Sequence, residues 1–193
     1  MRQTSLIHLC VFGFGLAISA VSASSAFADD YAIDPVHSSV TFKSRHMGIS
    51  WVHGRFNTFS GNVAYDKADP AKSSFEMTIK TDSVDTGNKG RDAHLANADF
   101  FDAKQFANIT FKSTSVKTAK DGLEVEGDFT MHGTTKKIKF LLQGGKEADI
   151  RGKKVVGFWT ELTVKRSEFG MDKMLEGIGD EVPVSISFEA GKK

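Results

Sequence analysis

The feature that most constrains the fold of this chain is a two-residue alternation of apolar and polar side chains, which recurs almost from end to end. Phe75, Met77 and Ile79, for example, alternate with polar or charged residues, as in a β-strand with one buried and one solvated face. Such segments occur within residues 40–45, 54–66, 75–80, 109–112, 123–131, 137–142, 156–165 and 182–188. Turn signals such as Asp69-Pro70, His132-Gly133 and Gly144-Gly145 separate several of them. The pattern predicts about eight strands.

Strands of this kind must bury their apolar faces without leaving long exposed edges. A sandwich or a closed barrel does so, and closure removes both edges. We therefore expect an all-β, antiparallel, eight-stranded barrel. An outer-membrane barrel has a similar alternation but carries girdles of Trp and Tyr at its strand ends. The chain contains only two Trp and two Tyr, so we expect no stable membrane insertion.

Residues 1–28 have the features of a secretory signal peptide. A basic start at Arg2 precedes an apolar run over residues 6–21, and Ala26-Phe27-Ala28 has the small-x-small pattern of a cleavage site. The run is shorter than the roughly 20 residues of a membrane-spanning helix. We therefore expect a single mature domain over residues 29–193. It contains no cysteine, which fits a bacterial periplasm.

The apolar faces are rich in Phe, of which the chain contains 16, against six Met. An eight-stranded barrel can either fill its interior with such side chains or hold one small ligand. Aromatic stripes most often form a filled core, and a slot for an apolar chain is the alternative. The side chains expected to face inward are Phe42, Phe56, Phe75, Met77, Ile79, Phe111, Phe129, Phe140, Phe158 and Phe169.

Two stretches, residues 85–108 and 166–181, lack the alternation. In the first, GRDAHLANADFFDAKQF (residues 90–106) contains helix-tolerant Ala and Leu residues and predicts a short helical crossover at one end of the barrel. Phe100 and Phe101 would pack onto the barrel, and Arg91 would pair with a nearby acid such as Asp92 or Asp99. In the second, Met171, Met174, Leu175 and Ile178 recur at helical spacing. They indicate either a small packed helix or a flap hinged at Phe169-Gly170.

Arg91, Asp92 and His94 have two interpretations, which the sequence leaves open. They either hold the crossover in place, or they meet the polar head group of an amphiphile whose tail Phe100 and Phe101 cover. Asp92 and His94 could also form the acid–base pair of a hydrolase or isomerase acting on a lipid-like substrate.

Other chemistry is not indicated. The remaining His residues are scattered without metal-ligand spacing, so we expect no metal and no cofactor. A net charge of +1 lacks the basic field that a nucleic-acid partner requires.

Several short motifs, in their order and spacing, resemble the YceI-like family over about residues 31–189. They include IDPVHS (33–38), GRF (54–56), RDAHL (91–95), GDFTMHGTTK (127–136) and RSEFG (166–170). One departure is Ala107, which stands where the family often has a Pro before a strand. The resemblance implies an extended, lipocalin-like barrel in the periplasm. It also implies a carrier, rather than an enzyme, that holds a long amphiphile such as a polyisoprenoid in its interior. It favours the slot over the filled core, and leaves open the identity of the lipid and whether the protein forms a homodimer.

Overall fold

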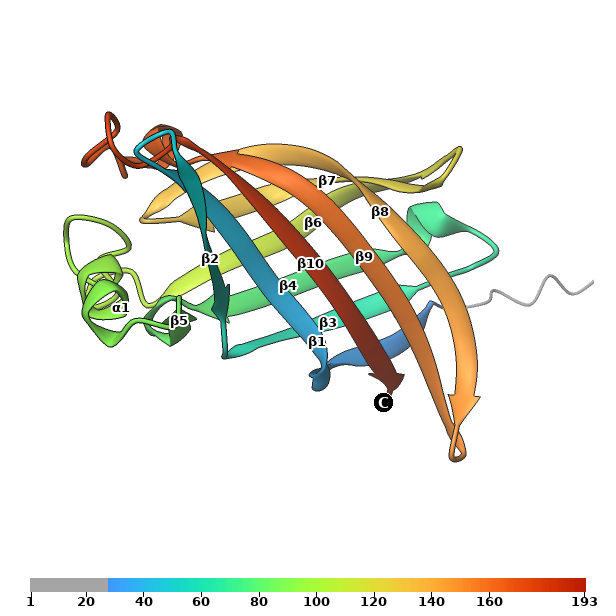
Figure 1. Cartoon of the computed structure of the whole chain (residues 1–193). Helices are drawn as coiled ribbons and strands as arrows, with labels where there is room; N and C mark the ends of the chain where they lie inside the picture. The colour runs from blue at the N-terminus through green and yellow to red at the C-terminus, as the bar shows by residue number, and fades with distance from the viewer. Residues whose placement is uncertain (1–27) are drawn as a thin grey trace, which may run out of the picture.

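The structure is a computed structural model that describes residues 28–193, and it contains the predicted closed antiparallel barrel (Figure 1). The predicted signal peptide lies outside the described residues, apart from Ala28. The strands are β1 (Asp29–His46), β2 (Ser50–Phe56), β3 (Phe59–Tyr65), β4 (Ser74–Lys80), β5 (Val84–Asp85), β6 (Asn108–Ala119), β7 (Gly122–Met131), β8 (Thr134–Ile150), β9 (Lys153–Lys165) and β10 (Glu181–Lys192). The helices are α1 (Lys89–Leu95) and the 3-10 turns η1 (Pro70–Lys72), η2 (Thr81–Ser83) and η3 (Arg166–Phe169). Within this part of the chain no helix is long and apolar enough to cross a membrane.

Ten strand segments fill the eight positions around the barrel. The sheet runs β10-β9-β8-β7-β6-β4-β3-β1, and pairing of β1 with β10 closes it. Strands β2 and β3 together act as one wall strand, because the first residues of β1 pair with β3 and its last residues pair with β2. The short β5 adds to the free side of β2. The prediction of an eight-stranded barrel is therefore confirmed.

The strand expected over residues 54–66 is divided into β2 and β3. The interruption falls at Asn57 and Thr58, whose backbone N–H groups donate to the carbonyl and the hydroxyl of Ser83 at 3.0 and 3.1 Å. Gly61 lies inside β3, where a Cβ atom would collide with the backbone carbonyl of Glu76 on the neighbouring strand. This glycine permits close approach of the two strands and does not break one of them.

One end of the barrel is filled by side chains. Tyr31, Val125, Val156 and Ala190 have no exposed surface there. The ring of Phe158 meets the edges of Tyr65 and Phe75 at centroid distances of 5.2 and 5.3 Å, in the edge-to-face geometry that aromatic pairs prefer. We call this the closed end.

A network of charges fastens strands together at the closed end. Asp29 accepts hydrogen bonds from Lys192 at 2.6 Å and Lys154 at 2.9 Å. Lys154 also lies 2.9 Å from Glu147, which accepts a hydrogen bond from the Tyr31 hydroxyl at 2.8 Å. Burial and the neighbouring Glu147 raise the pKa of Tyr31 to about 12. The network ties the start of β1 to β8, β9 and β10.

The opposite end carries α1, the β1–β2 and β7–β8 hairpins and the segment between η3 and β10 (Figure 1). The predicted turn at His132-Gly133 joins β7 to β8, with φ of 51° and 73° at its two residues. Two successive positive φ values are typical of a tight hairpin turn. His132 is further tied to the Phe169 carbonyl oxygen by a contact of 3.0 Å from Nδ1. We call this the open end.

Candidate functional site

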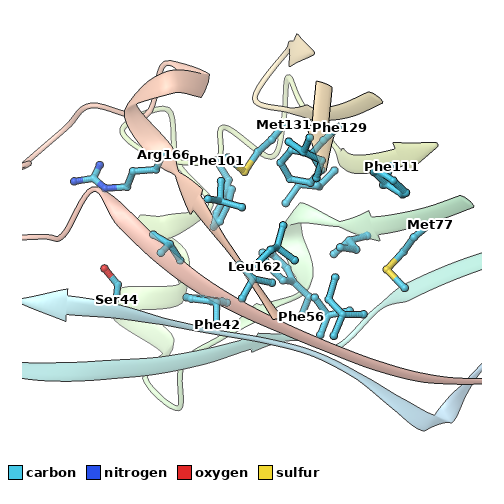
Figure 2. Close-up of a pocket in the computed structure, with 18 of the residues that line it drawn as sticks. Phe42, Ser44, Phe56, Met77, Phe101, Phe111, Phe129, Met131, Leu162 and Arg166 are labelled. Carbon is cyan, nitrogen blue, oxygen red and sulfur yellow. The ribbon is translucent and has the colours of Figure 1, made fainter. Parts of the chain in front are cut away.

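The barrel interior contains a cavity of ≈ 240 Å³ whose wall is almost entirely apolar (Figure 2). Of the side chains that the sequence predicted to line a slot, eight do line this cavity: Phe42, Phe56, Phe75, Met77, Ile79, Phe111, Phe129 and Phe140. They come from β1, β2, β4, β6, β7 and β8, so nearly the whole barrel contributes to the wall. Whether they contact a ligand stays a prediction.

Phe158 and Phe169 were expected in the same set, but the structure does not place them on the cavity wall. Phe158 is buried in the aromatic packing of the closed end and also lies 5.6 Å from the ring of Phe188. Phe169 is buried outside the wall, with its ring perpendicular to that of Phe129 at 5.4 Å. Phe158 lies behind the rings of Phe75 and Phe188, and Phe169 lies behind that of Phe129, all three of which line the cavity.

Polar groups meet the cavity mainly at the open end. Arg45 and His46 come from the end of β1, Arg91 and His94 from α1, and Arg166 from η3. Among the residues that line the cavity, Glu76 is the single carboxylate, and it pairs with Lys112 at 2.8 Å. The polar part of the lining is therefore richer in cationic side chains than in anionic ones.

The crossover begins as the sequence predicted, with a short helix. The side chain of Asn88 caps α1 by accepting a hydrogen bond from the Arg91 backbone N–H at 3.0 Å. Phe100 and Phe101 follow the helix and line the cavity. Phe101 packs edge-on against Phe56 at 5.5 Å, so the crossover is seated on the barrel through its aromatic residues.

The charged residues of the crossover have partners that differ from those expected. Within residues 28–193 Arg91 pairs with no acid; it donates from Nε to the Thr86 hydroxyl at 2.7 Å and from Nη2 to the Thr86 carbonyl at 2.9 Å. Asp92 accepts from the backbone N–H of Thr86 at 2.9 Å and from its hydroxyl, and it does not line the cavity. Arg91 and Asp92 thus hold the strand-to-helix connection from two sides.

His94 lies about one turn after Arg91 in α1 and has a different partner. Its Nε2 atom is 3.1 Å from a carboxylate oxygen of Asp99. The hydrogen bond from His94 and the charge of Lys173, 3.7 Å away, hold the pKa of Asp99 below its usual value. Because Asp92 and His94 bond to different partners, the geometry does not join them as an acid–base pair.

Arg166 is a site residue that the sequence interpretation missed. Its guanidinium is buried and donates to the backbone carbonyls of Met171, Lys173, Ile178 and Gly179 at 2.7 to 3.0 Å. Burial lowers the pKa of this group. Strand alternation could have indicated this position, because Arg166 continues the inward-facing series of Leu162 and Val164 on β9.

The segment held by Arg166 is not the helix that the spacing of its Met and Leu residues suggested. Residues 173–177 form turns, and Ile178 makes an isolated β-bridge with His46. Met171 is buried and lines the cavity together with Ile178, whereas Met174 and Leu175 point to solvent. Arg166 binds the Met171 and Lys173 carbonyls, which a helix would bond internally, whereas the Met174 carbonyl accepts from the Ile178 backbone N–H. Gly170 adopts a φ of 77°, which redirects the chain after η3; flap motion about it stays a prediction.

Ser44 places an unpaired polar atom in the cavity wall. It lines the cavity near the open end (Figure 2). Its Oγ atom is buried and is the one buried side-chain nitrogen or oxygen atom without a hydrogen-bond partner within residues 28–193. An unpaired buried hydroxyl costs about 1–3 kcal/mol, so a polar group brought into the cavity would find a free partner here.

Between residues 28 and 193, no three His, Cys, Asp or Glu side chains come together as a set of metal ligands.

Comparison with known sequences gives a consistent result over nearly the whole described chain. A family model described as the YceI-like domain matches residues 31–190. Protein YceI of Escherichia coli O17:K52:H18 is 38% identical over 185 residues, covering 93% of this chain and 95% of that protein. Protein YceI of Salmonella arizonae is 37% identical with the same coverage.

Solved structures show the same fold. BcnA of Burkholderia cenocepacia superposes with a TM-score of 0.75 at 26% identity, covering 81% of this chain and 98% of that one. The YCEI protein of Campylobacter jejuni gives 0.69 at 26% identity, covering 95% and 99%. A domain from Saccharophagus degradans, described as polyisoprenoid binding, gives 0.65 at 17% identity, covering 84% and 98%. The last likeness concerns the fold alone.

Proposed function

This chain belongs to the YceI-like family, and we propose that it binds a long-chain amphiphile, such as a polyisoprenoid, with the apolar tail inside the barrel. The observation that carries the proposal is the apolar cavity, which meets polar groups mainly at the open end. A filled barrel would not need such a space. The polyisoprenoid-binding domain of Saccharophagus degradans, which has the same fold, agrees with this class of ligand.

Burial of the tail would supply most of the binding free energy. Each methylene transferred from water contributes about 0.8 kcal/mol, so a tail of about ten methylenes contributes about 8 kcal/mol before the cost of association. After that cost, a longer tail or added polar contacts at the open end are required for micromolar binding.

The residues take two roles in this proposal. Phe42, Phe56, Phe75, Met77, Ile79, Phe111, Phe129 and Phe140 contact the tail, since all of them line the cavity. Arg91, His94, Phe100 and Phe101 lie where the head group would sit, while Asp92 supports Arg91 through their common partner Thr86.

The protein acts as a periplasmic carrier in this proposal and performs no catalysis. Export through the predicted signal peptide would deliver it to the periplasm, where it would shield the tail of the amphiphile from water. The acid–base alternative is not favoured, because Asp92 and His94 are engaged by Thr86 and Asp99 respectively.

The proposal is tested by filling the cavity from one strand while leaving the outside unchanged. Leu162 lines the cavity, and its neighbour Thr163 is exposed on the outer face of β9. Leu162→Trp is expected to weaken binding of a fluorescent prenyl-chain probe about tenfold or more, because overpacking opposes entry of the tail. Thr163→Trp is the matched control and is expected to change affinity less than about twofold. Equal affinities of the two variants would refute a ligand site inside the barrel.

A further inference from the structure

The exposed apolar side chains of this protein gather at the open end. Nine large apolar residues between residues 28 and 193 are exposed, and five of them lie in two short segments, the β1–β2 hairpin and residues 171–178. These five, which we call the tip surface, are Met47, Ile49, Trp51, Met174 and Leu175. Ile49, at the end of the hairpin, is 84% exposed, more than any of the others. Single exposed apolar residues are ordinary, but a cluster of them marks an interaction site.

Backbone hydrogen bonds join the two segments into one surface. The Met47 N–H donates to the Gly177 carbonyl at 2.7 Å, and the Gly179 N–H donates to the Arg45 carbonyl at 2.9 Å. Figure 1 shows both segments together at the end of the barrel that carries α1. Since Arg166 fixes the carbonyls of the second segment, the tip surface is held in a defined shape.

The tip surface is continuous with the cavity. Arg45, His46 and Val52 of the hairpin line the cavity, as do Met171 and Ile178 of the other segment. The same two segments therefore supply both the wall of the open end and the exposed apolar residues beside it. Whatever covers the tip surface lies next to the place where an amphiphile would enter.

The charge around the hairpin is basic. The Lys43 ammonium and the Arg45 guanidinium each lie 5.0 Å from the centre of the Trp51 ring, and residues 41–55 contain no Asp or Glu. The neighbouring segment contributes Lys173 together with Asp172 and Glu176, so the hairpin supplies the net positive charge. The hairpin thus exposes Ile and Met at its tip and carries a Trp with Lys and Arg beside its ring. Surfaces that enter a lipid interface have this composition.

We propose that the tip surface docks on an anionic lipid bilayer. Met47 and Ile49 enter the boundary between head groups and acyl chains, while Lys43 and Arg45 contact lipid phosphates. The open end then faces the membrane, so that an amphiphile passes between bilayer and cavity without crossing water. This passage rests on the proposed function, whereas docking itself requires no ligand in the cavity.

Vesicle binding with matched variants tests the docking. Full-length mature protein is sedimented with vesicles of phosphatidylcholine and phosphatidylglycerol. Ile49→Asp is expected to weaken binding about tenfold, because it removes an apolar side chain from the interface and adds a repelled charge. Lys43→Gln is expected to weaken binding about fivefold on these vesicles. Ile150→Asp is the matched control: Ile150 is also exposed, at 48%, beside the β8–β9 turn at the opposite end of the barrel. It is expected to bind as the wild type does.

The two tryptophans provide a second readout. In Trp159→Phe, Trp51 is the remaining tryptophan, and its emission is expected to shift to shorter wavelength when vesicles are added. In Trp51→Phe, the remaining Trp159 is 49% exposed on β9 and is expected to show no shift. Absence of sedimentation, equal losses for Ile49→Asp and Ile150→Asp, or a shift of Trp159 instead of Trp51 would each overturn the docking.

Probe titration without vesicles separates this proposal from the proposed function. Ile49 does not line the cavity, so Ile49→Asp is expected to bind the prenyl-chain probe normally. A wild-type protein that binds the probe but not vesicles overturns docking alone. One that binds vesicles but not the probe overturns the proposed function alone.

Discussion

The two ends of the barrel are built from the same alternating strands, but one end is filled by side chains and the other contains a cavity. At the closed end, Tyr31, Val125 and Val156 are fully buried and a charge network binds the strands together. At the open end, Phe42, Phe111 and Phe129 are only partly buried and face a cavity. A single buried cation, Arg166, organises the segment beside that cavity.

Apolar side chains on an inward face therefore do not by themselves produce a filled core. At the closed end the inward-facing aromatic rings pack against one another, as Phe158 does against Tyr65 and Phe75. Toward the open end the barrel also accommodates a crossover and three hairpin or loop segments, whose backbones line the rim. We therefore expect stability to be concentrated at the closed end and the capacity to bind a ligand at the open end.

The largest expected effect comes from truncating one ring at each end. Phe158→Ala is expected to lower the free energy of unfolding by about 3–5 kcal/mol, because it leaves a cavity in closely packed surroundings. Phe111→Ala is expected to lower it by no more than about half as much, since Phe111 already faces empty space. Urea denaturation of the two variants measures both values. Equal losses would show that the ends are packed alike.

The next effect concerns the cation that holds the open end. Arg166→Met leaves four backbone carbonyls without their donor and is expected to cost about 3 kcal/mol. Hydrogen exchange should accelerate in residues 171–179 and remain slow in β7 and β9. Arg91→Gln, in which an exposed arginine loses two bonds to Thr86, is the control and is expected to cost less than about 1 kcal/mol. Uniform acceleration across the barrel would contradict a local role for Arg166.

A smaller change of opposite sign is expected at Ser44. Ser44→Ala removes a buried hydroxyl that has no partner, so the ligand-free protein is expected to gain about 0.5–1 kcal/mol of stability. The exposed Ser60 on β3 serves as the control, and Ser60→Ala is expected to stay within about 0.5 kcal/mol of the wild type. A loss of stability in Ser44→Ala would mean that the hydroxyl is satisfied in solution.

The smallest effect tests the charge network of the closed end by pH. The hydrogen bond from Lys154 lowers the pKa of Glu147 in the folded protein, and those from Lys192 and Lys154 lower that of Asp29. Carboxyl groups with lowered folded pKa values stabilise the protein above their unfolded pKa values, and this contribution is lost as the pH falls through the folded values. Glu147→Gln is therefore expected to lower Tm by about 2 °C at neutral pH, allowing for solvent screening.

Near pH 3 the two proteins should melt at closer temperatures, because protonation then removes the same contribution from the wild type. Calorimetry at both pH values measures the difference. A difference that grows in acid would have the wrong sign for this network.

Much of the fold could be predicted from the sequence because strand alternation is a local property. The eight strand positions, the crossover helix and the His132-Gly133 turn follow from residues close together in the chain. The first part of β1, with Pro35 and a register irregularity between Asp34 and Ser39, was not predicted, because its pairing partner β10 lies at the other end of the chain.

The site was harder to predict for a related reason. Alternation assigns a side chain to the inner face but does not say at which depth along the barrel axis it meets others. Phe111 and Phe158 have the same pattern in the sequence, yet one lines the cavity and the other is packed away from it. The helical spacing of Met171, Met174 and Leu175 was misleading, because Arg166 binds the carbonyls that a helix would have used.

Native mass spectrometry of the protein, purified from its own host under non-denaturing conditions, tests directly whether the barrel holds a ligand. Retention of an amphiphile in the cavity predicts a species heavier than the mature polypeptide by the mass of one lipid, and Leu162→Trp should lack it. A wild-type protein that shows only the bare polypeptide mass, and takes up no prenyl-chain probe when one is supplied, would contradict the claim that the barrel is a binding site.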